Sequence, residues 1–221
     1  MKNNRKKNRW LTGFVGKRKE RLRRGEIDAS VIIPVEVSVS AAQKVMPGSQ
    51  AMEFLSKART IAQKDCLCRI KVKGCDSPVN VCIVLNKRAE DEIGKGTGKR
   101  ISVKQAGKIL DKTAKAGLVH LCLYNKGHDL YAICSCCPCC CHDLRAMLDF
   151  GVSDMVIESD YVVKYDKKKC INCGKCVERC SFGAFYTDDG RVEFDKEKCF
   201  GCGLCVTTCT SGASVLIKRK R

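Results

Sequence analysis

The order of apolar and polar positions predicts a mixture of short strands and helices. Ala29–Ser40 alternates between apolar and polar residues, which is the period of a strand with one buried face. Pro34 lies inside this alternation, and because proline cannot donate a ladder hydrogen bond, the pattern favours an edge strand. A helix is predicted to begin after Ser49, a good N-terminal cap, and to run to about Gln63.

Helical periodicity returns further along the chain. Ser102 and Gln105 have the spacing of a capping box, so a helix is predicted from there to Gly117, a typical C-terminal glycine. Another short helix is predicted over Asp143–Phe150, ended by Gly151. Between these helices the chain is expected to form strands.

The strands are predicted from apolar runs. Leu118–Tyr124 is typical of a buried strand, and its His120 and Cys122 are interpreted as core residues. Tyr161–Tyr165 and Ser214–Lys218 are predicted to pair. A hairpin around Asp188-Asp189-Gly190 joins Ala184–Tyr186 to Arg191–Phe194, and the glycine-rich Gly94–Arg100 is predicted to be a flexible loop. These elements together predict the α+β fold class.

Two copies of the pattern C-x-x-C-x-x-C-x-x-x-C occur near the C-terminus, beginning at Cys170 and at Cys199. In such runs three closely spaced thiolates bind one cubane iron–sulfur cluster and the fourth binds the other cluster. Zinc sites and disulfides are less favoured, because four-cysteine zinc sites use two separated C-x-x-C pairs. The spacing predicts one [4Fe–4S] cluster on Cys170, Cys173, Cys176 and Cys209, and a second on Cys180, Cys199, Cys202 and Cys205.

On these residues, the segment 161–217 resembles a bacterial-type ferredoxin with two [4Fe–4S] clusters. The resemblance implies one-electron transfer and a ferredoxin-like domain of two βαβ halves related by a pseudo-twofold axis. Gly174 and Gly203 follow the second cysteine of each run, where a small residue lets backbone N–H groups approach the cluster sulfurs. The family usually has proline after the fourth cysteine. Ser181 and Thr210 stand there instead, so the local turn is expected to differ.

Besides Cys122, ten further cysteines lie in the middle of the chain, and six of them fall within 134–141. Packing does not explain this density, and adjacent cysteines point in different directions, so one cubane cannot take all six. One additional [4Fe–4S] cluster is the favoured interpretation, with two clusters or a structural zinc ion as alternatives. The candidate ligands are Cys66, Cys68, Cys75, Cys82, Cys134, Cys136, Cys137, Cys139, Cys140 and Cys141.

This central part also resembles the N-terminal half of a group of poorly characterised cysteine-rich iron–sulfur proteins that end in a two-cluster ferredoxin domain. That resemblance implies metal binding and brings no known reaction with it. The shared segments are Cys66–Arg69, Gly74–Pro78 with Cys82, Ala116–His120 and Ile133–Cys141.

Composition adds a charge asymmetry. The chain of 221 residues has a formal net charge of +18, and much of the excess lies in the first 25 residues and the last four. The expected division is a basic arm at 1–26, a cysteine-rich metal-binding domain at 27–160, a ferredoxin domain at 161–217 and a basic tail at 218–221. A solvated arm is favoured, with docking to a redox partner as the functional alternative. Contact with a membrane surface or nucleic acid is less favoured.

No secretion signal or membrane-spanning stretch is visible, so a cytoplasmic location with reduced thiols is expected. A fully ligated [4Fe–4S] cluster exchanges single electrons, and no dinucleotide fingerprint or nucleophilic motif accompanies it. The favoured hypothesis is an electron-transfer protein or subunit without catalytic residues of its own. The alternatives are a reductase or activating subunit with an open iron site, and a redox-sensing nucleic-acid binder.

Overall fold

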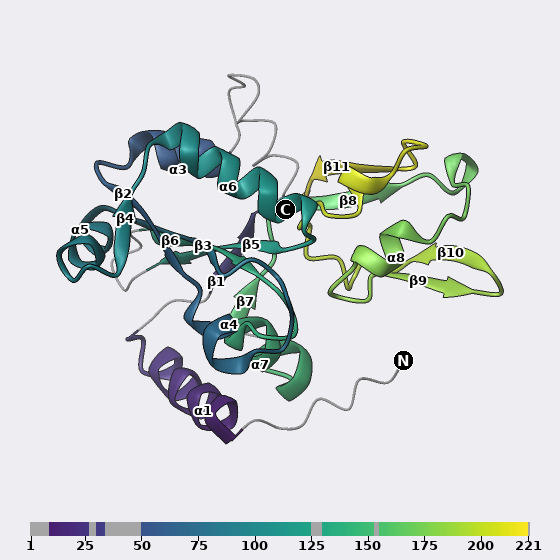
Figure 1. Cartoon of the computed structure of the whole chain (residues 1–221). Coiled ribbons are helices and arrows are strands. Elements are labelled where there is room, and N and C mark those ends of the chain that lie inside the picture. The colour runs from purple at the N-terminus through teal and green to yellow at the C-terminus, as the bar shows by residue number, and fades with distance from the viewer. Residues whose placement is uncertain (1–8, 27–29, 34–49, 125–129, 153–154, 221) are drawn as a thin grey trace.

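The computed structural model describes the chain except for residues 1–8, 27–29, 34–49, 125–129, 153–154 and 221. Helices and mostly antiparallel strands are mixed along it, so the fold class is α+β, as predicted (Figure 1). Before residue 160 the described helices are α1 (Arg9–Arg23), α3 (Gln50–Lys57), α4 (Leu67–Val72), α5 (Asn86–Gly94), α6 (Val103–Lys115) and α7 (His142–Phe150). The strands of this part are β1 (Ser30–Ile33), β2 (Ile61–Asp65), β3 (Asn80–Leu85), β4 (Gly98–Arg100), β5 (Val119–Tyr124), β6 (Leu130–Cys136) and β7 (Val156–Ile157).

These strands form one sheet in the order β4-β2-β3-β6-β5-β1-β7. β1 and β7 pair in parallel and the other neighbours pair antiparallel. In the centre of the sheet Ile133 of β6 lies opposite Ile83 of β3 on one side and Cys122 of β5 on the other. Because side chains alternate along a strand, this register decides which cysteines share a face.

The two faces of the sheet carry different cores. On one face α3 and α6 pack over Ile83, Cys122 and Ile133, and the capping box predicted at the start of α6 is present. The alternate positions Cys82, Cys134 and Cys136 therefore belong to the opposite face, on which α4 and α7 lie (Figure 1).

The C-terminal part is a smaller unit beside this sheet (Figure 1). β8 (Tyr161–Tyr165) pairs antiparallel with β11 (Ser214–Lys218), and β9 (Phe185–Asp188) forms a hairpin with β10 (Arg191–Phe194), as predicted. The helix α8 (Lys175–Arg179) and two short 3-10 helices, at Lys167–Lys169 and Val206–Thr208, complete the described elements.

The smaller unit contacts the central part through specific groups. The guanidinium of Arg179 donates hydrogen bonds of 3.1 Å to the carbonyl oxygens of Ala114 and Lys115, at the C-terminal end of α6. Phe182 and Phe200 stack with ring centroids 4.6 Å apart, and both rings pack against a core that the two parts share. The interface is therefore part apolar and part hydrogen-bonded.

Two predicted elements differ from the structure near the N-terminal edge of the sheet. The helix expected to reach Gln63 ends at Lys57, and Ile61 begins strand β2 instead. Tertiary contacts override the helical pattern, because Ile61 packs under α3 while β2 pairs with strands on both sides. The strand predicted at Ala29–Ser40 is described only as β1; it lies between β5 and β7 and is not at an edge, and the rest falls outside the described residues.

Two segments expected to lack regular structure have it. The predicted loop Gly94–Arg100 contains the end of α5 and strand β4, and Thr97 donates a 2.6 Å hydrogen bond to the carboxylate of Glu92. In the basic arm, residues 9–23 form helix α1, where the composition favoured a solvated chain. Arg18 of this helix forms an ion pair with the buried Asp143 of α7, an anchor that composition does not reveal.

His120 provides a pH test of the central core. It is fully buried, with Nε2 3.0 Å from Thr113 Oγ1, and burial lowers its pKa to about 4. The unfolded chain, with a histidine pKa of about 6.5, then binds more protons below that pH, so the stability contributed by neutral His120 is present above pH 6.5 and is lost as pH falls toward 4. From pH 6.5 to 5.5 this group should cost about 1 kcal/mol of unfolding free energy.

Urea unfolding of anaerobic protein at the two pH values measures this difference. His120→Gln should lose less stability than wild type over the interval, because its side chain does not titrate. Equal losses in both proteins would contradict the assignment.

Candidate metal centres

Two separate cavities in the C-terminal unit are each lined by four cysteines. All nineteen cysteines of the chain are free thiols in the structure, so each can act as a ligand. The first cavity is lined by Cys170, Cys173, Cys176 and Cys209. The second cavity is lined by Cys180, Cys199, Cys202 and Cys205. The structure thus brings together the two quartets that the spacing predicted, each drawn from both runs.

Matched positions in the two runs share a left-handed backbone conformation. The matched pairs are Asn172 and Gly201, Gly174 and Gly203, and Gly183 and Gly212, with φ between 52° and 77°. Such turns direct backbone N–H groups inward, so that the Asn172 amide lies 3.4 Å from Cys170 Sγ and the Ala184 amide 3.2 Å from Cys180 Sγ. Amide donors stabilise the negative charge of thiolate ligands.

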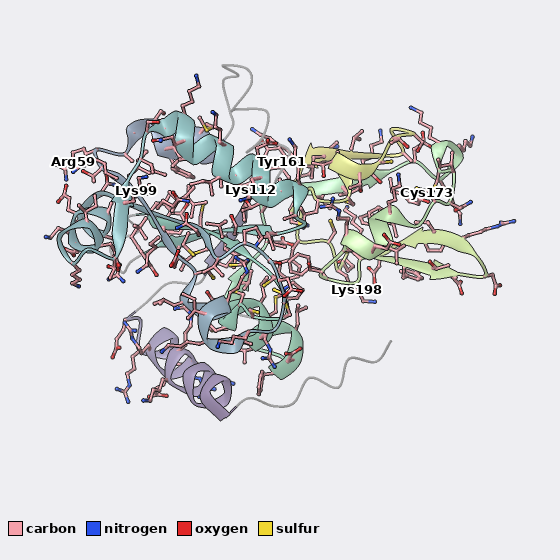
Figure 2. All side chains as sticks on the ribbon, in the orientation of Figure 1. Arg59, Lys99, Lys112, Tyr161, Cys173 and Lys198 are labelled. Atoms are coloured by element: carbon pink, nitrogen blue, oxygen red, sulfur yellow. The ribbon has the colours of Figure 1, made fainter. Side chains whose placement is uncertain are left out.

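The two cavities differ in their surroundings. At the first cavity, Cys173 is exposed, and Figure 2 shows it on the side of the unit away from the central sheet. At the second cavity, Cys202 is buried in a core that also contains Leu121 and Leu144 of the central part. Burial raises the pKa of Cys202 to about 12, so a nearby positive charge is needed to keep it ionised.

The ten central cysteines separate into two groups. One group has four members and is called the four-thiol group. The other has six members around a cavity of about 210 Å³ and is called the six-thiol pocket. The four-thiol group consists of Cys75, Cys137, Cys139 and Cys140, whose sulfurs all lie within 4.8 Å of one another. The six-thiol pocket is lined by Cys66, Cys68, Cys82, Cys134, Cys136 and Cys141, and Cys137 of the four-thiol group also borders its cavity.

Secondary structure explains how the six-thiol pocket forms. Cys134 and Cys136 are alternate residues of β6 and share one face with Cys82 of the neighbouring β3. Cys66 and Cys68 come from the start of α4, and Cys141 is the N-terminal cap residue of α7. The pocket is therefore formed by two strands and the starts of two helices, and not by one loop.

The thiols of this pocket form a continuous series of contacts in space. Cys66 lies beside Cys68 and Cys82, and these neighbouring thiols lower its pKa. Cys134 lies beside Cys136 and Cys82, and Cys136 also lies beside Cys141. Such a dense set of buried soft ligands is suited to iron–sulfur chemistry or to a thiophilic metal.

Two residues beside the thiols were not among the predicted site residues. His142 Nδ1 lies 3.0 Å from Cys68 Sγ. Arg69 is only 3% exposed and donates a 2.7 Å hydrogen bond to the carbonyl of Pro78. Burial alone would lower the pKa of Arg69, but the nearby thiolates of Cys137 and Cys66 raise it. The sequence offered one signal for these two residues: Arg69 directly follows Cys68, and His142 directly follows Cys141, both of which are candidate ligands.

Arg69 interacts with both groups of central thiols. Its guanidinium lies beside Cys137 of the four-thiol group and interacts electrostatically with Cys66 and Cys136 of the six-thiol pocket. A buried guanidinium at this position offsets negative charge that ligand thiolates bring. Cys122, by contrast, lies on the opposite face of the sheet in the core under α6, in agreement with its interpretation as a core thiol.

The chain matches a known family over part of its length. Residues 169–213 match the 4Fe-4S dicluster domain, and this segment contains all eight cysteines of the two C-terminal cavities. No curated protein gives a significant match to the chain. The segment is therefore an iron–sulfur, ferredoxin-like domain that binds at least one [4Fe–4S] cluster.

Gly201 and Gly212 offer a matched test of this domain. Both have φ +68°, so alanine at either position costs roughly 1–2 kcal/mol of backbone strain. A Cβ at Gly201 would also collide with the carbonyl oxygen of Tyr161, whereas nothing lies within 4 Å at Gly212. Gly201→Ala should lose most of the iron of the second cavity and Gly212→Ala should keep it.

Iron and sulfide per chain, measured on anaerobically purified proteins, distinguish the two variants. Equal retention would show that the Cys199–Cys202 turn does not need the close approach of Gly201 to Tyr161.

Proposed function

We propose that this protein is an electron-transfer protein, or an electron-transfer subunit, that carries single electrons between a partner at its surface and a further centre in its central part. The observation that carries the proposal is the pair of four-cysteine cavities, one at the surface and one against the central core.

In this proposal each cavity holds one [4Fe–4S] cluster on the four cysteines that line it. The donor set fits, because each cavity offers four free thiols, and backbone amides point at sulfurs such as those of Cys170 and Cys180. A cluster with four thiolate ligands supplies one-electron exchange and has no open site for bond chemistry. The matched backbone turns also support two halves related by a pseudo-twofold axis.

The exposure of the residues around each cavity decides which cavity a partner protein can approach. Ile171 is 65% exposed beside Cys173, so this end is open to a partner protein. Phe182 and Phe200 pack over the second cavity and against the shared core, which keeps water out of that end. Cys136 and Cys141 of the six-thiol pocket belong to the same core as Cys202, so the pocket is the next centre inward.

The six-thiol pocket is suited to an additional iron–sulfur cluster. Its volume of about 210 Å³ far exceeds the roughly 10–15 Å³ that one water molecule needs. It offers more thiols than four iron sites require, and His142 lies beside Cys68. We therefore retain one additional central cluster in the proposal and place it here.

Charge favours an acidic redox partner. Lys168 and Lys175 are exposed near Ile171, and α1 exposes further basic residues such as Arg21. The predicted role of the basic arm in docking is kept, with the difference that its described part is a helix packed on the central part through Arg18. A nucleic-acid role is less favoured, because the chain continues from α6 into strand β5 and not into a second recognition helix. No described helix is long and apolar enough to cross a membrane.

Metal content and reversible reduction test the proposal. Anaerobic protein should contain about 12 irons per chain, about eight of them in the C-terminal unit, and electron paramagnetic resonance should show about one electron taken up per cluster. Cys202→Ala should lose about four irons, because it removes a ligand of the second cavity.

Cys122→Ala is the matched control, since it also removes a buried thiol but one on the other face of the sheet. It should retain the full iron content. Protein that folds without iron or sulfide, or that loses iron equally in both variants, would refute the proposal.

A further inference from the structure

The geometry of the four-thiol group points to a second kind of metal centre. We propose that Cys75, Cys137, Cys139 and Cys140 bind a single tetrahedral Zn²⁺ ion that is separate from the iron–sulfur clusters. This site does not depend on the electron-transfer proposal, because it rests on different residues and a different metal.

Distances between the sulfurs carry the inference. Cys75 Sγ lies 3.6 Å from Cys137 Sγ and 3.8 Å from Cys140 Sγ, and all four sulfurs lie within 4.8 Å of one another. Zinc–sulfur bonds of about 2.3 Å in a regular tetrahedron place the sulfurs about 3.8 Å apart. In a cubane each thiolate binds a different iron, so the sulfurs are held apart by the whole cluster. The four-thiol group is too compact for that arrangement.

The backbone around the four thiols is built for close approach. A Cβ on Gly74 would lie 3.1 Å from the carbonyl oxygen of Cys139 and 3.2 Å from Cys140 Sγ, so a side chain there would require these neighbours to shift by a few tenths of an ångström. The Gly74 backbone lies beside the Cys140 thiol, and the guanidinium of Arg69 lies beside Cys137. Polar and positive groups this close to thiolate ligands offset their charge.

The position of the site indicates what the ion does. Cys137, Cys139 and Cys140 lie in the tight turn between β6 and α7, and Cys75 follows α4. Cys136 and Cys141, which line the six-thiol pocket, flank the same turn directly. A redox-inactive ion that joins this turn to the end of α4 therefore holds two walls of the pocket at a fixed separation.

Zinc, iron and sulfide are measured together on the anaerobic full-length protein. Wild type should contain about one zinc per chain, and the double variant Cys75→Ser/Cys139→Ser should contain almost none. The iron of the C-terminal unit should be unchanged in the double variant. Cys68→Ser is the matched control, since it alters the six-thiol pocket and should keep the zinc.

Cobalt substitution gives a second measurement that does not require a folded variant. Wild-type protein prepared with Co²⁺ should show the charge-transfer and d–d bands of a tetrahedral tetrathiolate ion. One iron without sulfide at this site would overturn the assignment to zinc. Loss of about four irons and four sulfides in the double variant, together with no zinc in the wild-type protein, would overturn the single-ion geometry. If the electron-transfer proposal is wrong but the zinc site is right, the iron content and the electron paramagnetic resonance signal will be lower than expected while the zinc content stays at about one per chain.

Discussion

Burial of thiols is the constraint on which the rest of this structure depends. A thiolate removed from water is costly unless a positive charge compensates it, and burial raises the pKa of Cys202 and Cys205 accordingly. Much of the core of the C-terminal unit is itself cysteine, packed with Val162, Val163 and Phe185. Metal binding and folding are therefore coupled in this unit, because the same side chains serve as core and as ligands.

The alternation of side chains along strands decides which cysteines take part. Cys122 and Cys134 occupy neighbouring strands, yet they lie on opposite faces of the sheet. Under α6, Cys122 packs with aliphatic residues and burial raises its pKa, as expected for a thiol with no metal partner. On the other face, Cys134 lies beside Cys136 and Cys82 and becomes part of a sulfur-rich pocket. One residue type thus has two roles that depend only on register.

Contact between the two parts of the chain decides which of the two C-terminal cavities is buried and which is exposed. A shared core joins Cys202 to Leu121 and Leu144, and Arg179 anchors α8 to the end of α6. The cavity nearest this core is buried, while the outer cavity reaches solvent at Cys173. An iron–sulfur domain placed in this way has one end open to solvent and one end packed against the central part of its own chain.

Local spacing determined much of this protein by itself. The two runs from Cys170 and from Cys199 predicted the quartets that line two cavities, because the repeated spacing is itself the ligand pattern of two clusters. Apolar periodicity and capping or turn residues predicted α6, α7 and the C-terminal hairpin, because these elements depend on residues close in sequence. The start of β2 at Ile61 was decided by strand pairing, and the anchoring of α1 by the ion pair of Arg18 with Asp143.

Only the tertiary structure divided the ten central cysteines into groups of four and six. Cys75 joins the turn at Cys137 where Arg69 of α4 donates a hydrogen bond to the carbonyl oxygen of Ser135 in β6, and Cys82 joins Cys134 because β3 pairs with β6. Sequence spacing carries no information about contacts between residues more than fifty positions apart, so it predicted the ligand type of these cysteines but not their partners.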